Sequence, residues 1–237
     1  LEEGIPPIFR ASQAIIVGDE MQMPPSNFFG STNNDIDDIW LEDETNALEM
    51  DADSLLNQAA RKLPSVLLGW HYRSRHESLI SFSNAAFYDN KLLTIPDKID
   101  AHQTLNEIIV SELNEVSNNV QYLFDRSISY HYLKNGIYES RTNEKEANYI
   151  AELLYQFYIN QQKESIGIVA FSIEQQTEIE DAIDKKARDD KAFDKWLEDE
   201  YKRIEDNQFI GLFIKNLENV QGDERDIIII STFSKRS

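Results

Sequence analysis

Cysteine is absent from the 237-residue sequence. Its absence excludes disulfides, thiolate zinc sites and cysteine nucleophiles together, and it suits the reducing cytoplasm. The four histidines are too scattered to form a metal cluster, so we assign no metal ligand. No apolar run approaches the roughly 20 residues that a membrane span needs, and the first residues, Leu-Glu-Glu-Gly-Ile-Pro-Pro, do not resemble a signal peptide. We therefore expect a cytoplasmic protein without a membrane partner.

Basic residues are scarce as well. Lysines and arginines number 23 against 43 aspartates and glutamates, which gives a net charge of −20. Contacts with nucleic-acid phosphates need clustered Lys and Arg, so this balance argues against a chain that binds nucleic acid by itself. The hydrophobic fraction of 41%, with 11% aromatics, is nevertheless enough for a sizeable core. The length is large for one α/β domain and small for two complete ones.

Negative charge is concentrated in one segment. Residues 35–53 contain nine acidic residues and no basic one, around a lone Trp40. Such a segment cannot bury enough apolar surface to offset the entropy of ordering it, so we interpret it as a solvated, poorly ordered insertion. A docking site for a basic partner is the alternative. Residues 184–206 carry dense charge of mixed sign and are expected to form exposed helix.

Hydrophobic periodicity predicts alternating strands and helices along most of the chain. The clearest helix is expected over residues 144–161, with one apolar face and a capping box formed by Asn143 and Glu146. The apolar run 165–171 is predicted to be a strand covered by helices on both faces, and Ser172 with Gln175 would cap the next helix. Further strands are expected at residues 14–17, 108–113, 128–133, 212–216 and 226–231, and another is expected to begin at residue 66. Further helices are expected at residues 53–62 and 77–88. This alternation is typical of an α/β fold with a parallel sheet.

Four segments join strand ends to polar residues. They are IIVGDEMQMPP (15–25), WHYRSRHESLISFSNAAFYDNKL (70–92), GIVAFSIEQQTEI (167–179) and KNLENVQGDERDIIIIS (215–231). In this order they resemble motif III, motif IV, the element before motif V, and motif V of superfamily 1 DNA/RNA helicases, and they are similar to a group of large bacterial helicase-like proteins. The resemblance implies a RecA-like (P-loop NTPase) fold, with a parallel sheet flanked by helices, and the second motor domain of a helicase.

The resemblance also implies nucleotide contacts. Gln22 corresponds to the γ-phosphate sensor and Arg73 to an arginine finger, whose planar, always charged fork suits developing phosphate charge. Glu224 corresponds to a contact near the nucleotide sugar, and Gly222 would let the backbone approach the ligand closely. Asp19 is the remaining residue that we expect at the nucleotide, which would be ATP with Mg²⁺ in the full-length protein.

Nucleic-acid contacts are implied for Asn216 and Gln221 of motif V. The family usually has Thr where Asn216 stands, which puts that contact in doubt. The expected partners are single-stranded DNA or RNA, bound through the full-length protein, and a first RecA-like domain of the same polypeptide. The protein would recognise the nucleic acid by its sugar–phosphate backbone rather than by its base sequence.

Simpler roles stay open for these residues. Asp19 and Glu20 could be a magnesium-binding Walker B pair, and Gln22 could be only a turn residue. Arg73 and Arg75 could be structural ion-pair partners, and Glu224 could pair with Arg225 or Arg73. We expect three aromatic residues in the core rather than as base-stacking platforms, namely Tyr72, Phe82 and Phe87.

A phosphate-binding Gly-x-x-x-x-Gly-Lys-Ser/Thr loop is missing from the sequence. We therefore expect a fragment that cannot hydrolyse ATP alone. Residues 1–30 would be the end of the first RecA-like domain, residues 31–62 an acidic insertion with a short helix, and residues 63–237 a second RecA-like domain truncated before motif VI. An ATPase-inactive RecA-like scaffold for protein partners is the alternative from another class. A nuclease is a weaker rival, because no constellation of paired carboxylates and lysine supports it.

Overall fold

The computed structural model describes residues 5–22, 54–96 and 107–232, so the acidic segment 35–53 lies outside the described residues. The chain divides into two compact units. The first contains residues 1–73 and 81–95, and the second contains residues 74–80 and 96–237. No helix in the described ranges is long and apolar enough to cross a membrane.

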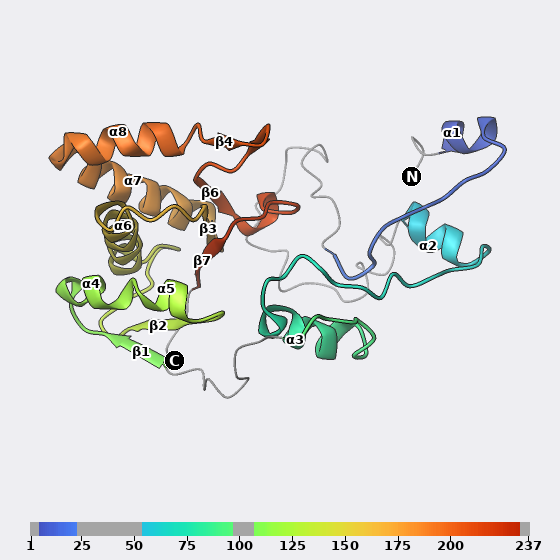
Figure 1. The fold of residues 1–237 in the computed structure, drawn as a ribbon, viewed down its shortest axis with the longest axis horizontal. Coiled ribbons are helices and arrows are strands. Elements are labelled where there is room, and N and C mark those ends of the chain that lie inside the picture. The colour runs from blue at the N-terminus through green and yellow to red at the C-terminus, as the bar shows by residue number, and fades with distance from the viewer. Residues whose placement is uncertain (1–4, 23–53, 97–106, 233–237) are drawn as a thin grey trace. The chain divides into compact units, whose positions relative to one another are not determined.

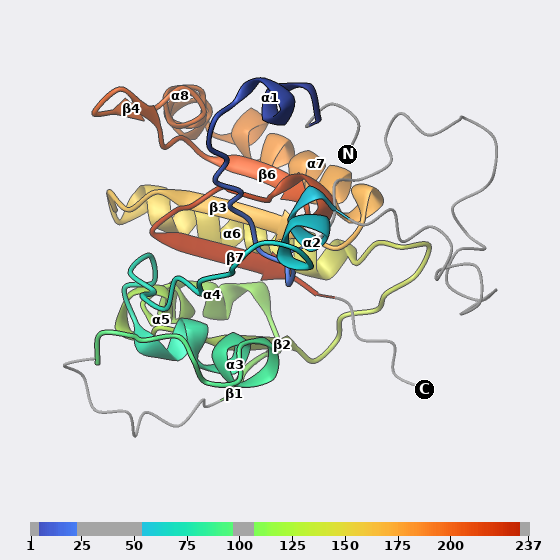
Figure 2. The same ribbon diagram turned by 90° about the vertical axis from the view of Figure 1, so that its right-hand side faces the viewer.

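A parallel sheet organises the second unit. Its strands are β6 (Phe213–Asn216), β3 (Ile166–Ala170) and β7 (Ile227–Ser231), in that order across the sheet (Figure 2). β3 pairs in parallel with both neighbours, and every one of its residues is buried. The strands expected at 165–171, 212–216 and 226–231 are thus confirmed, and the most apolar of them is the central one, with hydrogen-bonding partners on both sides.

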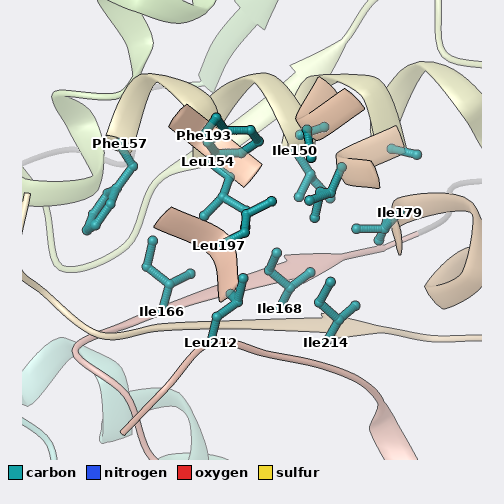
Figure 3. Packing of buried hydrophobic residues seen from close by; sticks show 14 of the residues in the cluster. Ile150, Leu154, Phe157, Ile166, Ile168, Ile179, Phe193, Leu197, Leu212 and Ile214 are labelled. Atoms are coloured by element: carbon teal, nitrogen blue, oxygen red, sulfur yellow. The ribbon is translucent and has the colours of Figure 1, made fainter. Parts of the chain in front are cut away.

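Three helices pack against this sheet: α6 (Glu144–Ile159), α7 (Ile173–Asp189) and α8 (Lys191–Glu200), which are stacked in Figure 1. Side chains alternate across a strand, so Ile166 and Ile168 of β3 point into the same core while Gly167 between them faces the other way. The cluster shared by helices and sheet includes Ile150, Leu154, Phe157, Ile166, Ile168, Ile179, Phe193, Leu197, Leu212 and Ile214 (Figure 3). The α/β fold with a parallel sheet flanked by helices is therefore confirmed.

Residues 184–206 are only partly the exposed helix that their charge predicts. Most of this stretch is helical, but Phe193 and Leu197 of α8 are buried in the main core. They are four residues apart and so lie on one face of the helix, while the charged residues occupy the other face. Trp196 of the same helix also packs against this cluster, and the high charge of the segment hides these apolar positions.

α6 also packs against a second, smaller sheet. β1 (Glu107–Val110) and β2 (Tyr130–Leu133) pair in parallel and overlap the segments 108–113 and 128–133 where strands are expected. Tyr149 and Leu153 of α6 are buried in a separate cluster with Ile108 and Val110 of β1. α6 is therefore buried on two sides, where the sequence predicts one apolar face.

The starts of α6 and α7 are tied together. Asn143 accepts a hydrogen bond from the N–H of Glu146 at 3.3 Å, and the Ser172 hydroxyl accepts one from the N–H of Gln175 at 3.1 Å, so both N-caps are confirmed. Neither helix has a complete capping box, because the N–H of Asn143 donates to the Gln175 side chain at 2.6 Å, so Glu146 does not accept it and Gln175 does not bond back to Ser172. Gln175 is buried, and this bond links the starts of two helices through residues that are 32 positions apart in the sequence.

Short elements connect these parts. In the second unit they are η3 (Leu113–Glu115), α4 (Val116–Asn119), α5 (Tyr122–Asp125), β4 (Ile204–Glu205), β5 (Gln208–Phe209) and η4 (Leu217–Asn219). β4 and β5 form an antiparallel hairpin, and both of its turn residues, Asp206 and Asn207, have positive φ. Asp and Asn tolerate this left-handed conformation better than most residues, which explains why the chain reverses here.

The first unit contains α1 (Ile5–Arg10) and α2 (Leu55–Ala60), and α3 (Glu77–Phe87) ends in it. The helices predicted at 53–62 and 77–88 are confirmed, but the strands predicted at 14–17 and from 66 are wrong. Ile15 is 81% exposed and Val66 is 84% exposed, and pairing near them is limited to one isolated bridge between Trp70 and Leu93. A strand exists only beside a partner, and the described part of this unit provides no sheet to pair with.

The three aromatic residues that we expected in the core are exposed instead: Tyr72, Phe82 and Phe87. Phe82 and Phe87 touch edge to face at 6.2 Å between ring centres. α3 has no buried residue, because nothing in the described part of the unit covers its apolar side. The prediction of core positions is therefore wrong for this segment.

The burial of α6 predicts a large loss of stability when one of its core side chains is shortened. Leu154 is fully buried in the main cluster, so Leu154→Ala should lower the free energy of unfolding of the chain by about 2–5 kcal/mol through lost contacts and the cavity left behind. Ile159 of the same helix is 49% exposed and provides the matched control, for which a change below about 1 kcal/mol is expected. Urea unfolding followed by circular dichroism measures both. Equal losses in the two variants would contradict the packing of α6.

Candidate functional site

The described part of motif III ends in a turn built around Asp19. Its carboxylate accepts the N–H of Met21 at 3.0 Å and the side-chain amide of Gln22 at 3.3 Å. The Gln22 N–H also donates to the Asp19 carbonyl at 3.4 Å. An aspartate that bonds the backbone two residues ahead is a common turn builder. Two of the residues predicted to contact the nucleotide, Asp19 and Gln22, are therefore brought together.

Motif III is joined to the end of motif IV through Tyr88, which follows α3. The Tyr88 hydroxyl donates to the Asp19 carboxylate at 2.6 Å, across 69 residues of sequence. Burial acts to raise the pKa of Asp19, but the hydrogen bonds from Tyr88, Met21 and Gln22 outweigh it and hold that pKa below its ordinary value. The same contact with Asp19, together with burial, raises the pKa of Tyr88 to about 12. Asp19 is therefore a charged acceptor for three donors.

The position of Tyr88 depends on how the chain leaves α3. Asn84 holds both the N–H and the carbonyl of Leu92, at 3.0 and 3.1 Å, and so closes the loop after the helix. Asp89 and Asn90 within this loop both have positive φ, which short polar residues tolerate best. Tyr88, at the start of the loop, is thereby fixed beside the motif III turn.

The two arginines of motif IV have different surroundings. Arg75 forms an ion pair with Asp226, inside the second unit. Arg73 belongs to the first unit, is exposed, and makes no hydrogen bond or ion pair with the residues that the structure describes. The ion-pair role that the sequence left open for both residues thus applies to Arg75.

The motif V loop, residues 217–226, is anchored at both ends. At its start, the buried Asn216 accepts the N–H of Asn219 at 3.2 Å and caps η4. At its end, Asp226 accepts the N–H and the hydroxyl of Ser165 at 2.9 and 2.8 Å and pairs with Arg75. Burial acts to raise the pKa of Asp226, but these partners lower it below its ordinary value. The loop therefore leaves and rejoins the sheet at fixed points.

A third anchor lies inside the loop. The Lys215 ammonium, on β6, donates to the Asp223 carboxylate at 2.5 Å. Lys215 also lies 5.3 Å from the centre of the Phe213 ring. Because Lys215 and Phe213 share one face of β6, this pair ties the middle of the loop to the sheet face opposite the main core.

Three residues predicted to contact ligands stand between these anchors: Gln221, Gly222 and Glu224, all exposed. Gly222 has a φ of +88° and nothing within 4 Å of where a Cβ would lie, so backbone conformation rather than crowding favours glycine. The Glu224 carboxylate has no ion-pair partner among the described residues, since Arg225 donates to the carbonyl oxygen of Glu224 rather than to its carboxylate.

The predicted residues fall into two groups. Asp19, Gln22 and Arg73 belong to the first unit, and Asn216, Gln221, Gly222 and Glu224 belong to the second. Within the described ranges, no group of three or more His, Asp or Glu residues could hold a metal ion.

Sequence reasoning missed the residues that hold these loops in place: Tyr88, Ser165, Lys215, Asp223, Arg225 and Asp226. All but Ser165 lie inside the quoted motifs. The available signal was the spacing of charges at 223–226 around the loop. The bonding partners of these residues cannot be read from spacing, because several of them are distant in sequence.

Removal of the contact between Tyr88 and Asp19 should shift the pKa of Asp19 in a defined direction. The pKa of Asp19 is lowered, so the contact stabilises the folded chain at pH values above the ordinary pKa of aspartate. This stabilisation is lost as the pH falls through the lowered pKa. Tyr88→Phe removes one donor and should raise the pKa of Asp19. Titration of the Asp19 carboxyl carbon by NMR measures this. Tyr130→Phe, on β2 of the second unit, is the control, and an unchanged Asp19 pKa in Tyr88→Phe would refute the contact.

Comparison with known proteins places the chain among helicase relatives. An uncharacterized ATP-dependent helicase of Mycoplasma genitalium is 35% identical over the whole chain, and its homolog in Mycoplasma pneumoniae is 31% identical over the same extent. The chain spans 19% of the length of each of these relatives. The similarity to an ATP-dependent helicase expected from the motifs is thus confirmed. Residues 52–237 match the family model described as an AAA domain, and the chain belongs to this family.

Proposed function

We propose that this chain supplies one side of the ATP site of a DNA or RNA helicase or translocase, as its second RecA-like motor domain. The other side would come from a first RecA-like domain of the same polypeptide, and single-stranded nucleic acid would cross both domains. The relatives named as ATP-dependent helicases support this activity. This chain spans 19% of the length of these relatives, which supports the proposal that it acts as one part of a larger polypeptide.

The main support for the proposal is the structure of the motif V loop. Its end is fixed by the Asp226–Ser165 contact and its middle by the Lys215–Asp223 contact, whereas Glu224 is exposed and has no ion-pair partner among the described residues. This loop leaves β6 at its carboxyl end and returns to the amino end of β7, where Asp226 is bonded to Ser165. Glu224 lies just before this return and would contact a nucleotide sugar from there.

Arg73 and Gln22 fit the catalytic part of the proposal. Phosphoryl transfer depends on positioned donors that stabilise charge on the transferred group. Arg73 is an exposed guanidinium, and Gln22 lies in a turn fixed by Asp19. The phosphates and Mg²⁺ would be held mainly by the first domain, because the phosphate-binding loop has no counterpart in these 237 residues. Bound ATP and Mg²⁺ would supply the reacting phosphoryl group and its charge neutralisation.

The isolated chain is expected to show no ATPase activity, because it lacks the lysine and backbone donors of a phosphate-binding loop. Phosphate release by the purified chain, with and without single-stranded nucleic acid, tests this. The double variant Gln22→Ala, Arg73→Ala serves as the background control. Turnover above that background would contradict the proposal of a shared site.

In the full-length polypeptide, Arg73→Ala is expected to lower kcat by roughly 10³ to 10⁵ with little effect on nucleotide binding, because an arginine finger acts in the transition state. Arg73→Lys should restore little, since an ammonium cannot reproduce the planar fork. Stopped-flow nucleotide binding and steady-state ATPase assays separate the two effects.

Arg75→Ala is the internal control for Arg73. Its side chain is 73% exposed and pairs with Asp226, so its loss should change stability by no more than about 1 kcal/mol and leave turnover nearly intact. ATPase activity that survives Arg73→Ala and collapses in Arg75→Ala would show that the finger is the other arginine.

A further inference from the structure

Arg225 directly follows Glu224 in the motif V loop and lies over two aromatic rings. Its guanidinium carbon lies 4.9 Å from the centre of the Phe213 ring and 5.2 Å from that of Phe209. Its Nε donates to the carbonyl of Gly211 at 2.9 Å, and its Nη1 donates to the carbonyl of Glu224 at 2.6 Å. One side chain therefore joins the β5–β6 connection to the backbone of Glu224.

Both rings occupy their places because a glycine lies beneath each of them. A Cβ on Gly167 of β3 would overlap the Phe213 ring. A Cβ on Gly211 would come within 2.7 Å of the Phe209 ring and 2.5 Å of the carbonyl oxygen of Glu200. Real Cβ atoms do not approach other atoms this closely, so the absence of a side chain at both glycines allows the two rings to occupy these positions beneath the Arg225 guanidinium.

The chemistry of the site requires arginine rather than lysine. The fork donates to two carbonyls from two separate nitrogens, Nε and Nη1, while its centre lies over two rings, and a single ammonium nitrogen cannot occupy both donor positions. The remaining terminal nitrogen, Nη2, is buried and has no hydrogen-bond partner among the described residues. Arg225 is thus fixed by two hydrogen bonds and by its contacts with two rings, and it bonds to no carboxylate among the described residues that would explain it as an ordinary surface ion pair.

We propose that Arg225 is a positioning residue, which fixes the backbone at Glu224 and thereby directs the Glu224 carboxylate toward the nucleotide. This inference rests on the proposed function, in which Glu224 contacts the nucleotide sugar. Arg225 itself touches no ligand. Its effect reaches the nucleotide through its bond to the Glu224 carbonyl.

Steady-state ATPase assays on the full-length polypeptide test the inference. Glu224→Gln is expected to raise the KM for ATP about fivefold to tenfold and to change kcat little, since a contact with the sugar contributes equally to the ground state and the transition state. Arg225→Lys should raise KM by a similar factor. The double variant should be no worse than about twofold beyond either single variant, because the two residues act as one unit.

The outcomes separate the inference from the proposed function. If wild-type protein lacks nucleic-acid-stimulated ATPase activity, the proposed function and the inference both fail. If Glu224→Gln leaves KM unchanged, the Glu224 contact fails, and the role of Arg225 fails with it. If Glu224→Gln raises KM but Arg225→Lys does not, or if the two effects multiply in the double variant, Arg225 does not act through Glu224 and the inference alone is overturned.

Two further variants guard against a general loss of folding. Phe209 is 53% exposed, so Phe209→Leu should fold normally while removing one face of the ring pair. It is expected to raise KM about twofold to threefold, again without adding to Glu224→Gln. Arg203→Lys is the matched control, because Arg203 bonds Glu200, Glu205 and the carbonyl of Lys163 and none of the motif V residues. A rise in KM in Arg203→Lys equal to that in Arg225→Lys would also overturn the inference.

Discussion

The burial of α6 on two sides is the interaction on which the rest of the second unit depends. Leu154 packs into the core with the three-stranded sheet, and Tyr149 packs into the cluster with β1. A helix that is apolar around most of its circumference has to be enclosed rather than laid on a surface. The start of α6 is in turn bonded to the start of α7 through Asn143 and Gln175. The two sheets and the helix that follows β3 are therefore held to one common element, and the motif V loop extends from a sheet that is already fixed.

Local features of the sequence were sufficient to predict most of this unit. The near-continuous apolar run 165–171 is buried at the centre of the sheet, and Asn143 and Ser172 cap the helices that they precede. These signals depend on residues within a few positions of each other. The second apolar face of α6, with Tyr149 and Leu153, was missed, because a helix with a clear first face gives no reason to look for another partner.

Features that depend on distant partners could not be predicted in the same way. Ile15 and Val66 have the composition of strand residues, but a strand forms only where a neighbour offers its backbone, and the described part of the first unit offers none. In the candidate site, the residue types of Gln22, Arg73 and Glu224 could be chosen from the motifs. Tyr88 could not be assigned to Asp19, nor Asp226 to Ser165, because 69 and 61 residues separate them.

The two glycines beneath the aromatic rings link positions that are otherwise independent in the sequence. Gly167 lies in the middle of β3 and has an unremarkable backbone, so a substitution there would be judged harmless from its conformation alone. Any side chain at this position has to displace Phe213, and with it one of the two rings beside Arg225. A larger residue at position 167 on β3 is therefore expected to be accepted only together with a smaller one at position 213 on β6.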